Sequence, residues 1–174
     1  MSEKTSMKIF LIGFMGSGKT TWAKIIADKL NIPFFDLDEL IEKRANLKIN
    51  DIFDIKGEKY FRKLEAVCLR ELHVLDSFIL ACGGGTPCFH DNMLVMNSLG
   101  VTAWLNTPKE VMATRLLEEA GHRPLVNGLT REKLHEFIED KLEERLQYYT
   151  QAKIVLDPTV STPDDLIQQL QKHA

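Results

Sequence analysis

The chain of 174 residues has few cysteines, no long apolar run and no excess of positive charge. Its three cysteines are an odd number, which favours reduced thiols over a framework of disulfides. No stretch approaches the roughly 20 apolar residues that a membrane helix requires. The apolar run Ile9–Met15 is not followed by a signal-peptide cleavage site. We therefore expect a cytoplasmic protein that has no membrane partner.

The charge balance argues against a second class of partner. The chain has 22 Lys and Arg residues against 25 Asp and Glu residues, a net charge of −3. Strong nucleic-acid binding rests on clustered basic residues that neutralise phosphates, so we expect no nucleic-acid partner. Any anion must instead be held by a few well-placed groups. The length fits one domain spanning residues 1–174, which we expect to act as a monomer.

Short apolar runs alternate with longer segments of helical periodicity, and this alternation predicts an α/β fold with a parallel sheet. Strands are expected at Ile9–Ile12, Phe34–Phe35, Phe78–Cys82, Val101–Leu105 and Ile154–Leu156. Helices are expected at Thr20–Leu30, Glu39–Arg44, Glu58–Leu75, Arg131–Tyr149 and directly after Thr162. Ligands of such folds bind beyond the carboxyl ends of the strands.

The first expected strand is followed directly by the phosphate loop, residues 13–20, with the sequence Gly-Phe-Met-Gly-Ser-Gly-Lys-Thr. It satisfies G-x-x-x-x-G-K-[ST], in which glycines let backbone N–H groups curl around phosphates. Lys19 can reach the β- and γ-phosphates, and the Thr20 hydroxyl can bind Mg²⁺. A plain glycine-rich turn is the alternative, but the strand-then-helix context is the one that the motif requires. We expect nucleotide binding.

Two motifs of other phosphate-loop proteins are missing. The chain has no N-K-x-D sequence for guanine recognition, and the strand at Phe78–Cys82 runs into glycines instead of an acid. The acids must therefore come from Asp36 and Asp38 at the end of the second strand. Carboxylates at i and i+2 on a strand point to one side, so Asp36 can face the metal and Asp38 the phosphoryl acceptor. The alternative explanation is that Asp38 caps the helix expected at Glu39–Arg44 and that Asp36 only ends the strand.

Three further segments carry functional signals. Arg62 lies between Glu58 and Glu65 at helical spacing, so these acids can aim its guanidinium at a carboxylate. Residues 83–85 are all glycine, which allows a ligand to approach the backbone, although a tight turn would need the same residues. In residues 119–127, a glycine and a proline flank Arg123, which predicts a lid whose arginine neutralises charge during phosphoryl transfer. A plain loop with an exposed arginine is the alternative there.

Together these motifs resemble the shikimate kinase family in their order along the chain. The resemblance rests on the phosphate loop, D-L-D, G-E-x-x-F-R-x-x-E, the triple glycine, R-P-L and an arginine before a tyrosine pair, Arg145-x-x-Tyr148-Tyr149. It implies a three-layer α/β/α P-loop kinase with a five-stranded parallel sheet in the order 2-3-1-4-5 and a lid. The implied reaction is ATP-dependent phosphorylation of the 3-hydroxyl of shikimate, in the pathway to aromatic amino acids, with Mg²⁺ as cofactor.

The resemblance also implies roles for individual residues. Asp38 would act as base, Lys19 and Arg123 would assist transfer, and Thr20 and Asp36 would serve Mg²⁺. The implied ATP site consists of Gly13, Gly16, Ser17, Gly18, Lys19, Thr20, Thr21, Arg115 and Arg123. The implied substrate site, within residues 36–65 and beyond, consists of Asp38, Phe53, Phe61, Arg62, Gly84, Gly85 and Arg145. The chain departs from the family pattern at Ala81 and Cys82, where hydroxyl residues are common.

Two alternatives remain open at this point. A small-molecule kinase of the same fold could act on gluconate or a nucleoside monophosphate, because residue chemistry separates two polyhydroxy carboxylates poorly. A non-catalytic nucleotide-binding module is the other alternative. Loss of catalysis would first erode Lys19, Asp38 or Arg123, and the sequence retains all three.

Overall fold

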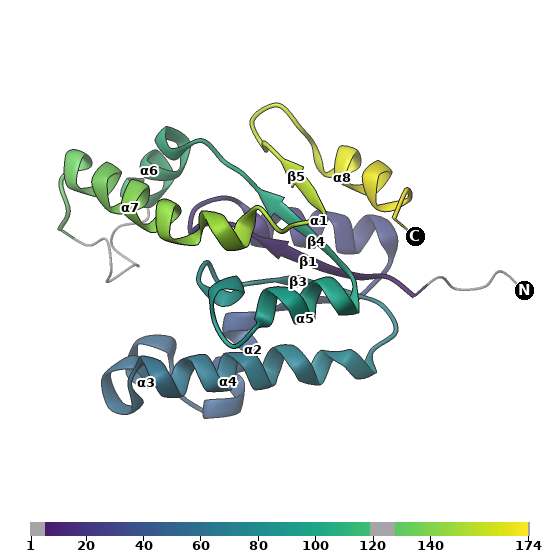
Figure 1. Ribbon diagram of the computed structural model, residues 1–174, viewed down its shortest axis with the longest axis horizontal. Helices are drawn as coiled ribbons and strands as arrows, with labels where there is room; N and C mark the ends of the chain where they lie inside the picture. Colours follow the sequence, from purple (N-terminus) through teal and green to yellow (C-terminus); the bar gives the residue numbers. More distant parts are fainter. Residues whose placement is uncertain (1–5, 119–127, 174) are drawn as a thin grey trace, which may run out of the picture.

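The computed structural model describes residues 6–118 and 128–173, and its centre is one sheet of five parallel strands (Figure 1). The strands are β1 (Lys8–Ile12), β2 (Phe34–Asp36), β3 (Phe78–Ala81), β4 (Val101–Leu105) and β5 (Ile154–Leu156). Their order in the sheet is β2-β3-β1-β4-β5, which confirms the expected order. In the central strand, Phe10 is in register with Leu80 of β3 and Thr102 of β4.

Helices connect the strands and cover both faces of the sheet. The α-helices are α1 (Lys19–Leu30), α2 (Leu37–Ala45), α3 (Ile49–Lys56), α4 (Glu58–Glu71), α5 (Asn92–Leu99), α6 (Lys109–Glu118), α7 (Arg131–Tyr149) and α8 (Pro163–Leu170). Two short 3-10 helices, η1 (Leu72–Val74) and η2 (Thr86–Cys88), follow α4 and β3 respectively. The bounds expected for the strands at β4 and β5 and for the helix α7 are confirmed.

The side chains of the central strand alternate between two hydrophobic cores. Ile9 and Leu11 pack against α1 and α8, with Ile26 and Leu166 among the buried contacts. Phe10 and Ile12 point to the opposite face, where the core includes side chains of α2, α4 and α5 and Tyr149 of α7. Both faces of the sheet are thus covered, as the continuous apolar runs of its strands require. The result is the expected three-layer arrangement.

Some expected boundaries were wrong by a few residues. The helix expected at Glu58–Leu75 ends as an α-helix at Glu71, and its last residues form η1. The helix expected at Glu39–Arg44 begins two residues earlier, at Leu37, because the preceding residue caps it. The strand expected at Phe78–Cys82 ends at Ala81, where the chain leaves the ladder toward the glycines. The second and third of these shifts lie at the carboxyl edge of the sheet, and the first lies at the amino edge, before β3 begins.

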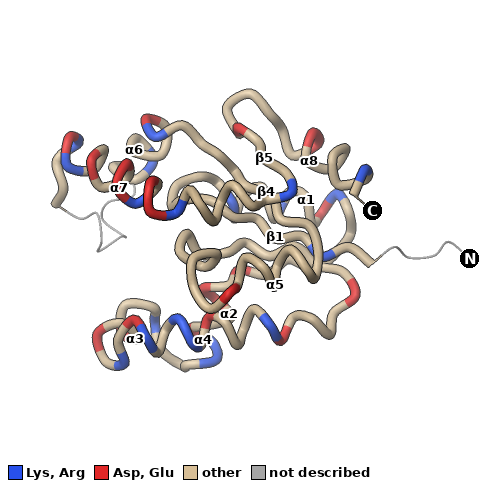
Figure 2. The backbone as a smooth tube through the Cα atoms, in the orientation of Figure 1, with Lys and Arg blue, Asp and Glu red and all other residues tan. Residues whose placement is uncertain are grey.

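Acidic and basic residues are interspersed along the outer helices, as Figure 2 shows for α4 and α7. Many pair locally, as in the salt bridges Lys141–Glu144 on α7 and Arg44–Glu71 between α2 and α4. None of the described helices is both long and apolar enough to cross a membrane.

Candidate active site

A cleft of about 580 Å³ lies at the carboxyl edge of the sheet. Its lining joins the phosphate loop to the end of β2, to the first two glycines after β3, and to α6. The residues that line it are Met15, Gly16, Ser17, Gly18, Lys19, Thr20, Thr21, Trp22, Asp36, Asp38, Cys82, Gly83, Gly84, Arg115 and Pro158. The motifs separated along the sequence therefore meet in one cavity, at the edge where α/β folds bind ligands.

The phosphate loop owes its shape to backbone conformations that favour glycine. Gly18 has φ 93° and lies just before the first residue of α1, where it lets the chain turn into the helix. A Cβ on Gly13 would lie 2.8 Å from the carbonyl oxygen of Leu105, so β4 leaves no space for a side chain there. The hydroxyl of Thr107 donates to the carbonyl of Ser17 at 3.0 Å and holds the loop from the β4 side. The loop is thus preformed for anion binding at a helix N-terminus.

Lys19 and Thr20 lie at the start of α1 and face the cleft. The Lys19 ammonium donates to the carbonyl oxygens of Gly13 and Phe14 at 2.9 and 2.8 Å. The Thr20 hydroxyl lies 3.2 Å from Oδ2 of Asp36, so a hydroxyl and a carboxylate converge beside the loop. The loop itself therefore orients the ammonium, while β2 supplies the acid.

The structure overturns the strand-end geometry expected for Asp36 and Asp38. Asp36 ends β2 and also caps α2, its Oδ1 accepting a hydrogen bond from the backbone N–H of Asp38 at 3.0 Å. Asp38 is therefore the second residue of a helix, and strand alternation does not set its direction. Both carboxylates nevertheless line the cleft, because the first turn of α2 opens onto it. The alternative weighed for this pair was therefore wrong about the cap, which is Asp36 and not Asp38, although Asp36 does end the strand.

The surroundings of Asp38 make its carboxyl group unusually basic. Its surface is open to the cleft, yet many protein atoms lie around it and weaken its hydration. This desolvation, together with the negative charges of Asp36 and Glu65, raises the pKa of Asp38 to about 6 against the opposing effect of Lys19. A carboxylate with such a pKa is ionised at neutral pH and accepts a proton more readily than an ordinary aspartate.

Arg62 is aimed by the two acids that flank it on α4, as the spacing predicts. Its Nε donates to Glu58 at 3.2 Å and its Nη1 to Glu65 at 3.0 Å. Only 12% of the Arg62 side chain is exposed, and none of the Glu65 side chain is, so this pair differs from a solvated surface pair. Two rings lie over the guanidinium, Phe61 at 5.0 Å and Phe89 at 4.2 Å from its Cζ. The cation is thus fixed by both charge and stacking.

The triple glycine makes room for two arginine side chains. A Cβ on Gly85 would lie 2.7 Å from Nη2 of Arg62, and one on Gly84 would lie 3.0 Å from Nη1 of Arg145. Tyr149 holds this segment from α7 by donating its hydroxyl to the Gly84 carbonyl at 2.6 Å. The close approach of both guanidinium groups to the backbone is the physical reason for glycine at these two positions.

Arg145 reaches the triple glycine from α7, with its Cζ 5.2 Å from the centre of the Phe14 ring. Its Nη1 is buried and lacks a hydrogen-bond partner within the part of the chain that the structure describes. A buried cationic donor without a partner is costly unless a ligand satisfies it. The expected aromatic pair Phe53 and Phe61 lies nearby on α3 and α4, its ring centres 4.6 Å apart. Neither Arg62, Arg145 nor either ring lines the cleft itself. The two guanidinium groups lie at Gly84 and Gly85, and the Phe61 ring lies 5.0 Å from Cζ of Arg62.

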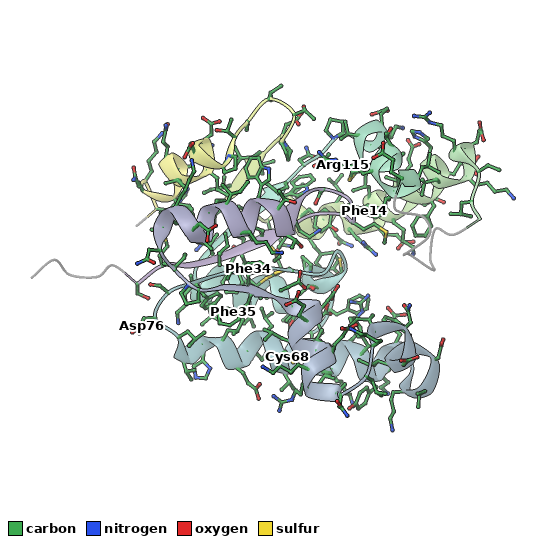
Figure 3. The ribbon with its side chains drawn as sticks, turned by 180° about the vertical axis from the view of Figure 1, so that it is seen from behind. Phe14, Phe34, Phe35, Cys68, Asp76 and Arg115 are labelled. Carbon is green, nitrogen blue, oxygen red and sulfur yellow. The ribbon has the colours of Figure 1, made fainter. Side chains whose placement is uncertain are left out.

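Arg115 lies at the other end of the cleft, on α6. Its Nη1 donates to the carbonyl of Gly16 at 2.9 Å, which ties α6 to the phosphate loop. Figure 3 shows Arg115 and Phe14 on the same side of the molecule, above the sheet seen from behind. Pro158, in the loop after β5, lines the cleft together with Arg115. These two residues belong to the end remote from Arg62.

Several site residues were not predicted. Thr86, Phe89 and Tyr149 contact Glu65, Arg62 and Gly84 respectively, and Trp22 lines the cleft. Cys82 lines the cleft as well, but burial raises the pKa of its thiol, which therefore stays protonated. Arg123 and the lid expected at 119–127 lie outside the described residues.

Comparison with known proteins places this site in a family. The model of the shikimate kinase family matches residues 15–174. A curated shikimate kinase of Bacteroides thetaiotaomicron is 42% identical over 151 residues, which cover 87% of this chain and 86% of that protein. The chain belongs to the shikimate kinase family. Membership confirms the expected enzyme, a kinase of the pathway to aromatic amino acids, and the family uses ATP.

Solved structures of shikimate kinases agree with this membership and with the fold. The crystal structure of the enzyme from B. thetaiotaomicron is similar with a TM-score of 0.86 and 38% identity, covering 95% of this chain and 97% of that one. The shikimate kinase of Acinetobacter baumannii in complex with shikimate gives a TM-score of 0.84 and 31% identity, covering 97% and 93%. The sequence left open a kinase of gluconate or of a nucleoside monophosphate, and a non-catalytic nucleotide-binding module. Family membership supports shikimate kinase and not these alternatives.

Proposed function

We propose that this chain transfers the γ-phosphoryl group of ATP to the 3-hydroxyl of shikimate, with Asp38 as the base. The observation that carries the proposal is the single cleft in which the phosphate loop and Asp38 face each other. A phosphoryl donor held by the loop and an acceptor hydroxyl held by Asp38 would meet within it. Phosphoryl transfer depends mainly on such positioning and on charge stabilisation.

ATP would bind with its phosphates in the phosphate loop and its adenine between Arg115 and Pro158. Backbone N–H groups of Gly16 and Gly18, the N-terminus of α1 and the Lys19 ammonium supply positive potential for the phosphates. The adenine end is inferred from the position of Arg115 and Pro158 at the far side of the same cleft. Ser17 and Thr21 complete this lining, and Gly13 supports it through its contact with Lys19.

Thr20 and Asp36 suit the Mg²⁺ ion that accompanies ATP. Both offer hard oxygen donors, and the two oxygens lie 3.2 Å apart beside the phosphate loop. No cluster of three or more acidic, His or Cys side chains forms a metal cage among the described residues. Mg²⁺ typically keeps its waters and binds one or two protein oxygens plus substrate phosphates, so a small donor set fits it. When bound, the ion would neutralise charge on the phosphates.

The chemical step assigned to Asp38 is a proton transfer coupled to displacement. Its carboxylate accepts the proton of the 3-hydroxyl, while that oxygen forms a bond to the γ-phosphorus. The bond between the γ-phosphorus and the β,γ-bridging oxygen breaks, and ADP leaves with the electron pair. The raised pKa of Asp38, about 6, suits a base that works near neutral pH. Arg123 as the group that neutralises developing charge stays a prediction.

Arg62 and Arg145 would bind the carboxylate of shikimate from two sides. Both guanidinium groups converge on the triple glycine, and the buried Nη1 of Arg145 offers a donor that a carboxylate oxygen would satisfy. Gly84 and Gly85 allow the two guanidinium groups to lie where a side chain would otherwise meet them. The A. baumannii relative binds shikimate, which supports the same ligand at the matching end of this fold.

The decisive measurement is release of ADP from Mg·ATP with shikimate, gluconate and AMP offered in parallel. We expect turnover with shikimate and none above background with the other two acceptors. Turnover with gluconate or AMP, and none with shikimate, would contradict the assignment of the substrate.

We also propose that the chain acts as a single domain and a monomer in the cytoplasm. One sheet serves both hydrophobic cores, and the site is assembled within one chain. Light scattering of the purified protein, with and without ATP and shikimate, tests whether it is a monomer. A mass of twice 19.9 kDa in solution would contradict the monomer.

A further inference from the structure

A network of three buried polar side chains lies next to Arg62, the residue proposed to bind the carboxylate of shikimate. Its members are Thr86 in η2, Glu65 in α4 and Asn92 at the start of α5, and each of the three residues is 0% exposed. Burying polar groups is unfavourable unless each finds a partner of good geometry. The three residues satisfy one another and thereby tie three elements together beside Arg62.

Thr86 contacts the acid that holds Arg62. Its hydroxyl donates to Oε1 of Glu65 at 2.7 Å, while Oε2 of the same carboxylate accepts from Nη1 of Arg62 at 3.0 Å. A carboxylate that is bonded through both oxygens has its last torsion fixed, which also fixes the direction from which it holds the guanidinium. Without the hydroxyl, the Glu65 carboxylate could rotate and take Arg62 with it.

Asn92 in turn holds the backbone of Thr86. Its side-chain amide donates from Nδ2 to the Thr86 carbonyl at 3.0 Å and accepts at Oδ1 from Nη1 of Arg70 at 2.8 Å. Arg70 donates to the Ala66 carbonyl as well, so both ends of this connection are anchored on α4. The turn that carries Thr86 is therefore clamped to the helix that carries Arg62.

The loop between η2 and α5 folds back over Arg62 at a conformational cost. His90 and Asp91 both adopt left-handed backbone conformations, with φ 50° and 57°, which are uncommon for residues other than glycine, although His and Asp adopt them more often than most. Arg70 holds the first of them through a hydrogen bond to the His90 carbonyl. The preceding residue, Phe89, places its ring 4.2 Å from the Arg62 guanidinium. The hydrogen-bonded network and the loop that carries Phe89 therefore both fix the position of the Arg62 guanidinium.

We propose that Thr86 and Asn92 are positioning residues that hold the Arg62 guanidinium in the orientation needed for the carboxylate of shikimate. Thr86 acts through Glu65, and Asn92 acts by fixing the turn on which Thr86 lies. The inference rests on the proposed function, in which Arg62 binds that carboxylate. It assigns neither residue a contact with substrate.

Replacing the hydroxyl while keeping the shape of the side chain tests the role of Thr86. We expect Thr86→Val to raise the KM for shikimate about tenfold, a typical loss for a hydrogen bond to a charged group. The KM for ATP should stay within about twofold, because Thr86 directly follows the triple glycine and is not part of the phosphate loop. Thr86→Ser keeps the hydroxyl and should restore the KM for shikimate.

Thr102→Val serves as the matched control. Thr102 is also 0% exposed, and its hydroxyl donates to the Asn97 side chain at 2.7 Å. It lies near the amino-terminal end of β4, away from the cleft. We expect this variant to lower the melting temperature as Thr86→Val does, with both KM values unchanged.

The experiment separates three outcomes. If the wild-type protein does not phosphorylate shikimate, the proposed function fails. If it does, and Arg62→Ala raises the KM for shikimate while Thr86→Val leaves it unchanged, only the positioning role is overturned. If Thr86→Val does not fold, Asn92→Asp decides, because it keeps the acceptor for Arg70 but loses the donor to Thr86. An unchanged KM for shikimate in Asn92→Asp overturns the proposal, and a selective rise supports it.

Discussion

Asp36 caps the helix on which Asp38 lies, its Oδ1 accepting the backbone N–H of Asp38 at 3.0 Å. The other oxygen of Asp36 lies 3.2 Å from the Thr20 hydroxyl. One carboxylate therefore links the phosphate loop to the helix turn that presents the proposed base. This link couples the position of Asp38 to that of the phosphate loop.

Asp38→Asn is expected to abolish turnover while ATP binding stays nearly intact. Asparagine has the shape of aspartate but cannot accept the proton, and loss of a general base typically lowers kcat about 10²–10⁴-fold. Steady-state kcat and calorimetric titration with ATP measure the two effects separately. A kcat like that of the wild type would remove Asp38 from the mechanism.

Turnover is expected to depend on pH through Asp38. Because its pKa is raised to about 6, the carboxylate should take up a proton, and kcat/KM should fall, as the pH drops through that value. An unperturbed aspartate, with a pKa near 3.9, would keep kcat/KM constant down to about pH 5. The kcat/KM, which reports the enzyme without bound substrates, is measured from about pH 5 to 8 at ATP and shikimate concentrations below their KM values, with circular dichroism as a check of folding at each pH.

Asp36→Asn is expected to weaken Mg²⁺ activation without unfolding α2. Asparagine caps helices about as well as aspartate, so the hydrogen bond to the N–H of Asp38 should persist. The loss of a negatively charged oxygen beside Thr20 should raise the Mg²⁺ concentration needed for half-maximal rate. Initial rates against free Mg²⁺ at constant ATP measure this. An activation curve unchanged from the wild type would show that Asp36 has no part in holding the ion.

Arg62→Ala is expected to raise the KM for shikimate, by about 10–100-fold for the loss of charge-assisted hydrogen bonds, with little change in the KM for ATP. Arg44→Ala is a matched control, because Arg44 also pairs with a glutamate of α4 but lies half exposed and away from the cleft. The control should leave both KM values unchanged. Equal effects of the two variants would show that Arg62 acts only through general charge or stability.

Local signals sufficed for part of this molecule. The phosphate loop, the bounds of α7 and the cap of α8 by Thr162 depend on residues a few positions apart, so a pattern in the sequence predicts them. The flanking of Arg62 by Glu58 and Glu65 is equally local, because helical spacing brings them together. The strand order came from family resemblance, which the structure confirms.

Other features depend on contacts between distant segments. Thr86 meets Glu65 across 21 positions and Tyr149 meets Gly84 across 65, and neither pair has a spacing that a pattern could reveal. Asp38 was assigned to a strand end by the alternation of strand side chains, with capping by Asp38 as the alternative. In the structure Asp36 is the cap, and its hydrogen bond to the N–H of Asp38 starts the helix.

The residue types in and near the phosphate loop therefore predicted the type of reaction, but they did not predict the positions of the side chains in the site. Parallel strands bring their carboxyl ends to one edge whatever the lengths of the connecting helices, so residues remote in sequence converge there. The raised pKa of Asp38 and the fixed orientation of Arg62 arise from that convergence, because burial and neighbouring charges exist only once the chain has folded.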